Sequence, residues 1–484
     1  MPARTGKQYL EGLKPARNVW VDGARVDNIV GHPALAGAAQ ALADVYDLQL
    51  ADPDTCLIPD PETGEPISMG HMIPASKDDI AKRHKCLEKI ADFSVGLMGR
   101  TPDYLNVTFA GFAGDADLWG QHGNEAGAEA LVAYQKLLRR EDLSLTHAIV
   151  PPTVDKAQGD TPRPGDPIQL RKIEDTEHGI IVSGGRALAT LAPFADDMAI
   201  YPRAPFPEGS EEFALCFSVP MTTPGLTILC RDSMSAESNR FDHPLSSRFD
   251  EQDAFVIFDR VEIPRDRLFI DGNLPVYNSV MQGSWLSNIT HQTMIRATVK
   301  LEFAWGLARR MAETLNAKDP GTQQMLGEIW CYKEFTRSAV IAAEAEAHEH
   351  VEGFWVPDVK PLFALRAMLP LWFPRVNEII QIIGAHYMLA APRAAQFGDP
   401  DLRPLIDEYL SGALDVGSKE RASIFRLAWD FTSAEMGGRN LQYERFYLAS
   451  SPRNMQRAPS VDDATRSAML VDRFIKEALE DCRD

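Results

Sequence analysis

The chain has 484 residues, 45% of them hydrophobic and 24% charged, so it is long enough for about three domains of ordinary size with a large core. Its formal net charge of -20 argues against nucleic acid and membrane partners, because both demand basic surface. The six cysteines show no CxxC or CxxxC spacing, and the N-terminus lacks the apolar core of a signal peptide. We therefore expect a reduced, cytoplasmic protein without a zinc ribbon or an iron-sulfur cluster.

Three segments with different periodicity follow one another. From Pro33 to about Arg140, apolar residues recur at spacings of three and four, which predicts helices. From Leu143 to about Phe269 the period changes to two, in short runs separated by Gly, Pro and Asp, which predicts strands. From Leu286 onward long helical patterns return and predict a bundle kinked by proline. The predicted domains are mostly helical, strand-rich and helical, at residues 1–142, 143–275 and 276–484.

In the first segment, the stretch RTPDY places an arginine and a tyrosine four residues apart around a proline. Thr101, Pro102 and Asp103 predict a helix start with a hydroxyl cap, a preset backbone angle and an acid in the first turn. Arg100 would lie just outside this helix and Tyr104 in its first turn. Taken alone, the stretch favours an ordinary helix entrance with a surface arginine.

The strand-rich segment begins with LSLTHAIV, whose alternation puts His147 on an apolar face. Without further evidence, such a histidine is more often a core residue than a catalyst. A loop, VPPTVDK, follows and carries Thr153 and Lys156. Further on, the pair Gly184 and Gly185 predicts a turn.

No GxGxxG motif follows a strand and no GxxxxGK[ST] motif occurs, so neither a Rossmann nicotinamide site nor a P-loop is expected. His348 and His350 would point to different sides of a helix, and no metal site is predicted. Near the C-terminus, GGRNLQYERFYLASSPRN concentrates arginines and tyrosines. This composition suits a subunit interface or the anionic tail of a cofactor, and the interface is favoured.

Five stretches, in this order, are similar to one family: GLMGRTPDYLNV, LTHAIVPPTVDK, LATLAP, FDHPLSSRFDEQDAFVIFDRVEIPRDRLF and GGRNLQYERFY. They resemble the oxygenase components of two-component, flavin-dependent aromatic hydroxylases, the 4-hydroxyphenylacetate 3-monooxygenase family, over nearly the whole chain. The resemblance implies an α+β, acyl-CoA-dehydrogenase-like fold with an N-terminal helical domain, a middle β-barrel and a C-terminal helical bundle. It also implies a homotetramer, which the extensive apolar faces of the C-terminal helical segments favour as well.

The resemblance further implies an activity. A separate NAD(P)H:flavin reductase would supply reduced FAD, or alternatively FMN, and the chain would hydroxylate a phenol ortho to its hydroxyl group with molecular oxygen, through a flavin hydroperoxide. Free phenols ionise only near pH ~10, so the site must stabilise the phenolate. By the resemblance, Arg100, Tyr104 and His147 do this and bind the substrate, with His147 as the proton acceptor. Acyl-CoA dehydrogenase and 4-hydroxybutyryl-CoA dehydratase activities remain as alternatives; the dehydratase is disfavoured because RTPDY and the helix after His291 lack cysteine.

The remaining site residues are also implied by the resemblance. Positions near the flavin are Thr153, Lys156 and Thr190, and those that would meet its pyrophosphate, from the same or a neighbouring subunit, are Arg439, Ser451 and Arg453. After LATLAP, relatives that hold 4-hydroxyphenylacetate tend to have small hydroxyl residues, whereas this chain has Tyr201, Pro202 and Arg203. Arg203 is either a ligand for a substrate carboxylate or an exposed loop residue, and both interpretations stay open.

Overall fold

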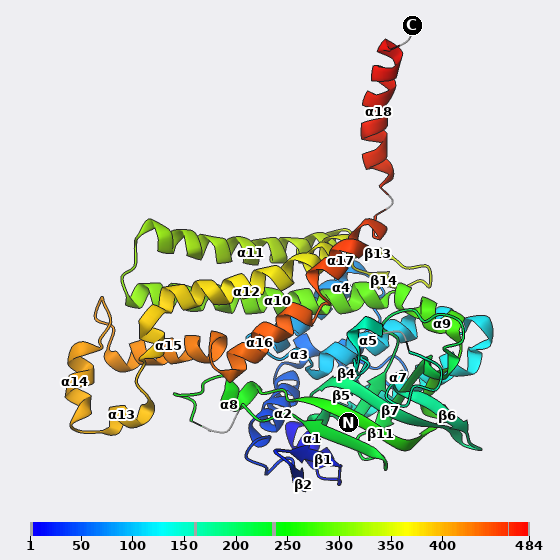
Figure 1. The fold of residues 1–484 in the computed structure, drawn as a ribbon, viewed down its shortest axis with the longest axis horizontal. Helices are drawn as coiled ribbons and strands as arrows, with labels where there is room; N and C mark the ends of the chain where they lie inside the picture. The colour runs from blue at the N-terminus through cyan, green and yellow to red at the C-terminus, as the bar shows by residue number, and fades with distance from the viewer. Residues whose placement is uncertain (1–2, 159–161, 235–238, 463, 483–484) are drawn as a thin grey trace.

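The computed structural model describes residues 3–158, 162–234, 239–462 and 464–482 (Figure 1). Helices dominate the first segment, as its period predicted. After the short first helix, α1 (Gly6–Gly12), the longer helices are α2 Ala36–Ala51, α4 Lys77–Phe93, α5 Pro102–Gly114 and α7 Glu125–Glu141. Two short strands, β1 (Val19–Val21) and β2 (Ala24–Val26), precede α2 and were not predicted. They join the sheet of the next segment, because β1 pairs in parallel with β10.

The middle segment forms two sheets, with strand orders β2-β1-β10-β11-β7-β6 and β12-β9-β8-β5. The alternating runs of the sequence become these strands: β5 Leu145–His147, β6 Arg171–Asp175, β7 Gly179–Thr190, β8 Asp197–Ile200, β9 Leu215–Pro220, β10 Leu226–Cys230, β11 Asp253–Pro264 and β12 Leu268–Asp271. In the second sheet β5 pairs in parallel with β8, and His147 lies opposite Ala199. This pairing decides which side chains surround His147.

The predicted turn at Gly184 and Gly185 is wrong, because both residues lie inside the long strand β7. Gly184 has φ +124°, a conformation that favours glycine. The backbone oxygen of Gln169 lies only 2.4 Å from where a Cβ of Gly184 would be. The glycines therefore allow a neighbouring chain segment to approach the strand closely.

The last segment is a helical bundle in which α10, α11 and α12 run alongside one another (Figure 1). Its main helices are α10 Trp285–Thr314, α11 Pro320–Ala345, α12 Val359–Leu389, α14 Leu402–Tyr409, α15 Ser418–Thr432, α16 Glu435–Phe446, α17 Ser451–Arg457 and α18 Thr465–Asp481. α12 contains Pro370 and Pro374, but its non-helical residue is Ala385, further along than the predicted proline kink.

A large hydrophobic core connects the three segments. It includes Leu42 from α2, Val182 from β7, Ile228 from β10, Leu301 from α10 and Phe431 from α15. The predicted order of helices, β-sheets and helical bundle is thus confirmed. α18 projects away from this body (Figure 1), and none of its residues is buried. Within the described ranges, every helix is too short or too polar to cross a membrane.

Candidate active site

The start of α5 positions two of the three predicted catalytic residues. The helix begins at Pro102, as predicted, with Arg100 just before it and Tyr104 in its first turn. The predicted hydroxyl cap is wrong, because the Thr101 side chain makes no capping hydrogen bond and instead bonds the carboxyl group of Asp103. That carboxyl also accepts a hydrogen bond of 2.8 Å from Gln292 in α10, which fixes the helix start against the bundle.

Arg100, Tyr104 and His147 converge, as the resemblance implied. The Nε of Arg100 donates to Nε2 of His147 over 3.1 Å. The guanidinium carbon lies 4.1 Å from the ring centre of Tyr104, and the Tyr104 and His147 rings meet edge to face with centroids 5.6 Å apart. The three residues are only 7%, 6% and 6% exposed. They form a buried, cationic, hydroxyl-bearing site.

The hydrogen bond from Arg100 decides how His147 is protonated. Burial, with the charge of Arg100 as a smaller cause, holds the pKa of His147 well below its ordinary value, so the ring is neutral. A neutral imidazole carries one hydrogen, and its Nε2 already accepts from Arg100. We therefore assign that hydrogen to Nδ1. His147 presents a donor to the site, whereas the sequence interpretation made it a proton acceptor.

Tyr201 occupies the other side of His147. Its hydroxyl hydrogen-bonds Nδ1 of His147 and also shares a hydrogen bond with Tyr104. Its ring lies 5.6 Å from that of Phe112, and the residue is 3% exposed. Strand register is the signal that could have found it: Ala199 lies opposite His147, and side chains two residues apart share a face.

The carboxylate of Glu251 holds Arg100 in place. One of its oxygens accepts from the backbone N–H groups of Gly99 and Arg100, at 2.6 and 2.8 Å. Its other oxygen accepts from Arg439 in α16 at 3.0 Å. The two tyrosines of the same region, Tyr443 and Tyr447, face the Arg100 guanidinium at 5.9 and 4.5 Å. The arginine- and tyrosine-rich stretch near the C-terminus thus positions Arg100, through Glu251 and the two tyrosine rings.

Arg439 lies in an internal ion-pair network, whereas we expected a cofactor or interface contact. It donates twice to Asp253, at 2.8 Å each, and Asp253 also accepts from Thr190 at 2.8 Å. Burial acts against ionisation of Asp253, but Arg439 outweighs it and holds the pKa of the carboxyl well below its ordinary value. Because Arg439 is buried with two carboxylates of its own chain, its charge is already neutralised there.

The other residues expected near the flavin occupy different surroundings. Thr153 and Lys156 are exposed on the loop that follows β5. Ser451 begins α17, and its hydroxyl donates to the backbone oxygen of Ala367 at 2.6 Å. Arg453, in the first turn of the same helix, lies close enough to Arg366 of α12 for the two charges to repel. The flavin contacts of Thr153, Lys156, Ser451 and Arg453 stay predictions. Arg453 and Arg366 together form a further cationic group.

Arg366 was missed by the sequence analysis. Burial, together with the charges of Arg457 and Arg453, lowers the pKa of Arg366 to about 10. Its Nε has no hydrogen-bond partner in the part of the chain that the structure describes. Tyr104 contributes to its electrostatic surroundings, so this group of arginines lies near the catalytic residues. Guanidinium groups in this arrangement suit a phosphate-bearing ligand.

Arg203 lies in the loop after β8, half-buried, beside a second arginine of β7, Arg186. Arg186 is 6% exposed, and its Nε has no hydrogen-bond partner within the described residues. Burial, with Arg203 as a smaller cause, lowers the pKa of Arg186 to about 10. Arg203 is therefore not an exposed loop arginine, and its binding of an anion stays a prediction.

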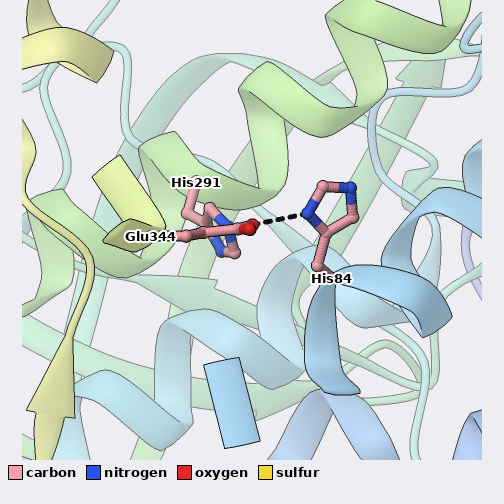
Figure 2. Close-up of side chains that lie close together, drawn as sticks. All are labelled: His84, His291 and Glu344. Carbon is pink, nitrogen blue, oxygen red and sulfur yellow. Dashed lines mark hydrogen bonds and ion pairs between the residues drawn. The ribbon is translucent and has the colours of Figure 1, made fainter. Parts of the chain in front are cut away.

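Among the residues that the structure describes, one group could hold a metal ion: His84, His291 and Glu344, whose ligand atoms all lie within 4.8 Å of one another. Figure 2 shows both histidines directed at the carboxylate, with His84 Nδ1 at 2.5 Å and His291 Nε2 at 2.7 Å. The Nδ1 of His291 is buried without a partner within the described ranges. A metal on Nε2 would require a hydrogen on that unpartnered atom, so a hydrogen-bonded trio fits better.

Comparisons with known proteins identify the family of the chain. The model of the 4-hydroxyphenylacetate 3-hydroxylase N terminal matches residues 5–270, and that of its C terminal matches residues 277–476. The 4-hydroxyphenylacetate 3-monooxygenase oxygenase component of Thermus thermophilus is 37% identical over 99% of this chain and 98% of its own. The oxygenase component of a Rhodococcus 4-nitrophenol 2-monooxygenase is 32% identical over 92% of this chain and 85% of its own.

Solved structures extend this similarity to the fold. The oxygenase component of a 4-hydroxyphenylacetate 3-monooxygenase, complexed with FAD and 4-hydroxyphenylacetate, superimposes with a TM-score of 0.94 at 36% identity, covering 99% of this chain and 100% of that one. A 4-hydroxybutyryl-CoA dehydratase from N. maritimus has a TM-score of 0.87 at 19% identity over 97% and 94% of the two chains, and so shares the fold alone. The chain therefore belongs to the 4-hydroxyphenylacetate 3-hydroxylase family.

Proposed function

We propose that the chain is the oxygenase component of a two-component monooxygenase, which uses reduced FAD and oxygen to hydroxylate a phenol at the ortho carbon. The observation that carries this proposal is the buried convergence of Arg100, Tyr104 and His147. The relatives more than 30% identical are monooxygenases by name, which favours this function over the dehydratase and acyl-CoA dehydrogenase alternatives.

The three side chains favour the ionised form of the substrate. The guanidinium of Arg100, the hydroxyl of Tyr104 and the Nδ1 hydrogen of His147 offer a positive charge and two donors to one phenolic oxygen. Each of them lowers the pKa of a bound phenol, because it stabilises the phenolate more than the neutral form. A phenolate ring is the stronger nucleophile at its ortho carbon. The apolar cluster that contains Leu105 and Phe112 excludes water around it.

Reduced FAD, when bound, supplies the electrons and the activated oxygen. Its diphosphate fits the cationic group of Arg366, Arg453 and Arg457, with Ser451 at the start of the same helix. Thr153, Lys156 and Thr190 are assigned to the flavin side by resemblance. Arg439 then acts as a positioning residue, through Glu251 and the backbone of Arg100. FMN remains the alternative flavin and has only one phosphate for this site.

The remaining partners follow from the same chemistry. Since the sequence carries no dinucleotide fingerprint, a separate NAD(P)H:flavin reductase supplies the reduced flavin. The chain acts in the cytoplasm as a homotetramer. Large apolar side chains exposed on α11, α12 and α18 support assembly, among them Phe335, Leu389 and Phe474.

The proposed function is tested with chemically reduced FAD, oxygen and a panel of phenols. We expect ortho-dihydroxy products by mass spectrometry, and none with NADH in place of reduced FAD. Arg100→Gln should abolish product, whereas Arg445→Gln, an exposed arginine of α16, should not. Absence of hydroxylated product from every phenol, or oxidation of NADH by the purified chain, would refute the proposal.

A further inference from the structure

The phenol-binding groups of the site are already bonded to a phenol that belongs to the chain. Tyr201 receives the Nδ1 hydrogen of His147 and shares a hydrogen bond with Tyr104. These are two of the three groups that the proposed function assigns to the phenolic oxygen of the substrate. The Nδ1 hydrogen of His147 can serve one good acceptor at a time.

Packing leaves little room for a second phenol beside Tyr201. Its ring lies 5.6 Å from that of Phe112, 6.3 Å from that of Trp285 and 5.2 Å from that of His147. With Tyr201 only 3% exposed, a substrate cannot reach Nδ1 of His147 unless this side chain rotates away.

The backbone around Tyr201 favours movement of the side chain over movement of the loop. Tyr201 directly follows β8, and Pro202 after it restricts its backbone to an extended conformation. Further along, Phe206 stacks on Tyr277 at 4.9 Å and exchanges two hydrogen bonds with Asn278. Both ends of the segment are thus held, so displacement of Tyr201 requires a change in its χ1.

We propose that Tyr201 is a resident phenol: its hydroxyl holds the position of the substrate's phenolic oxygen in the free enzyme, and the substrate must displace it. This inference rests on the proposed function, because it uses the same three groups. It makes Tyr201 an internal competitor of the phenolic substrate. A neutral phenol merely exchanges with Tyr201, whereas an ionised one forms charge-assisted hydrogen bonds that are about twice as strong. An ionised phenol therefore displaces Tyr201 more readily than a neutral one.

The test uses 4-nitrophenol and the flavin-free protein, because only the ionised form of this probe is yellow and its binding is followed by absorbance. Tyr201→Phe keeps the ring and removes the competing hydroxyl. We expect 4-nitrophenol to bind this variant roughly 3- to 10-fold more tightly, as expected when one buried hydrogen bond no longer has to be broken. 4-Ethylphenol should bind more tightly by the same factor, because either ligand displaces the same Tyr201 hydroxyl.

Two further variants make the result specific. Tyr134→Phe removes another buried tyrosine hydroxyl of the same apolar cluster, which bonds Asp197 at 2.8 Å, and should leave the affinity unchanged. Tyr201→Leu repeats the test without an aromatic ring in case Tyr201→Phe does not fold. Equal or weaker binding of 4-nitrophenol by the Tyr201 variants than by the wild type would overturn the inference.

This outcome is separable from failure of the proposed function. If the proposed function is wrong, reduced FAD and oxygen yield no hydroxylated product, whatever the affinity for 4-nitrophenol. If only the inference is wrong, the wild type hydroxylates phenols but the Tyr201 variants bind 4-nitrophenol no better than it does.

Discussion

At the scale of single residues, the contact between Arg100 and His147 determines what the histidine can do. Because Nε2 accepts from Arg100, His147 can take a proton there only if this hydrogen bond breaks. Its Nδ1 hydrogen is directed at the phenolic position instead. We therefore expect His147 to stabilise the phenolate as a donor, with the phenolic proton leaving to another acceptor or to water.

Two substitutions of His147 distinguish a hydrogen-bond donor from a general base. Asparagine has an N–H that can donate but cannot accept a proton at neutral pH, whereas leucine can do neither. With His147→Leu we expect the yield of hydroxylated product per reduced flavin to fall roughly 10- to 100-fold, the loss of one hydrogen bond to a charged group. With His147→Asn we expect a clearly smaller loss. Product analysis after a single turnover measures both yields.

The comparison has an internal check. If His147 is the proton acceptor, both variants should lose product equally, since neither side chain is a base. An equal loss in His147→Asn and His147→Leu would therefore contradict the donor assignment and support the interpretation made from the sequence.

The arginine pair Arg186 and Arg203 makes a separate prediction about the substrate. Two guanidinium groups, one of them buried, suit a carboxylate on the side chain of the phenol. Arg186→Gln should weaken binding of 4-hydroxyphenylacetate roughly 10-fold, the effect of a charged hydrogen bond. It should leave the neutral 4-ethylphenol unaffected. Isothermal titration calorimetry with both phenols measures the difference.

Arg260→Gln is a suitable control, because Arg260 is an exposed arginine of β11 that pairs with Glu174 at 2.7 Å. If Arg186→Gln lost the same affinity for both phenols, Arg186 would support the structure and would not bind the carboxylate.

The sequence could predict the catalytic residues only through family resemblance. Bottom-up, His147 was a core residue and Arg100 a surface residue, because neither pattern reveals that the two side chains meet. Arg439 shows the opposite limit: its partner Asp253 lies 186 residues away, so no local pattern could reveal that its charge is neutralised internally. Tyr201 was noticed only as a departure from relatives, and its contact depends on strand register.

At the scale of elements, the carboxylate of Glu344 in α11 joins three helices, because it bonds His84 of α4 and His291 of α10 (Figure 2). Burial acts to raise the pKa of Glu344, but the two histidines lower it to about 2. Burial acts to lower the pKa of His84, but Glu344 raises it above its ordinary value. For His291, burial prevails and lowers the pKa to about 4.

These pKa shifts determine how the loss of unfolding free energy in Glu344→Gln depends on pH. The raised pKa of His84 stabilises the fold below pH 6.5, and this contribution disappears as the pH rises through that pKa. The lowered pKa of Glu344 stabilises it above about 4.5, and this contribution disappears as the pH falls toward about 2. Glu344→Gln should therefore cost most stability between these limits, about 1–3 kcal/mol. Its cost should shrink at pH 8.

Chemical denaturation at pH 5.5 and pH 8 measures this cost. The lowered pKa of His291 destabilises the fold below about pH 6.5 in both proteins, and this effect cancels in the comparison when His291 stays neutral in the variant as well. Glu334→Gln, on the same helix but paired with Arg337, removes a carboxylate that has no histidine partner among the described ion pairs and serves as the control. A cost of Glu344→Gln that is the same at both pH values would contradict the assignment.

The long helices and strands were more predictable from the sequence than the short strands and the role of the glycines. Long helices and alternating strands appeared where the periods predicted, because each buries one continuous apolar face. β1 and β2 were missed because three residues carry too little alternation to identify a strand. Gly184 and Gly185 were misread because glycine serves both turns and close backbone approach.

At the scale of the whole molecule, α18 projects from the rest of the described chain without burying an apolar face. None of its residues is buried, and its large apolar side chains share one face: Leu470, Val471, Phe474, Ile475 and Leu479. An isolated helix of this length is marginal in water, so packing against another surface must hold it. In the proposed homotetramer, a second copy of the chain would cover this apolar face.

Serine substitutions on the apolar face of α18 test this contact. Phe474→Ser together with Ile475→Ser should lower the assembly below four times the chain mass of 53.6 kDa, measured by light scattering. Lys476→Ser and Glu480→Ser change the polar face of the same helix and should leave the mass unchanged. Because the catalytic residues all lie in one chain, a smaller assembly should still bind 4-nitrophenol. A tetramer that survives the apolar substitutions would show that α18 is not required for assembly, and a wild-type monomer would contradict the homotetramer itself.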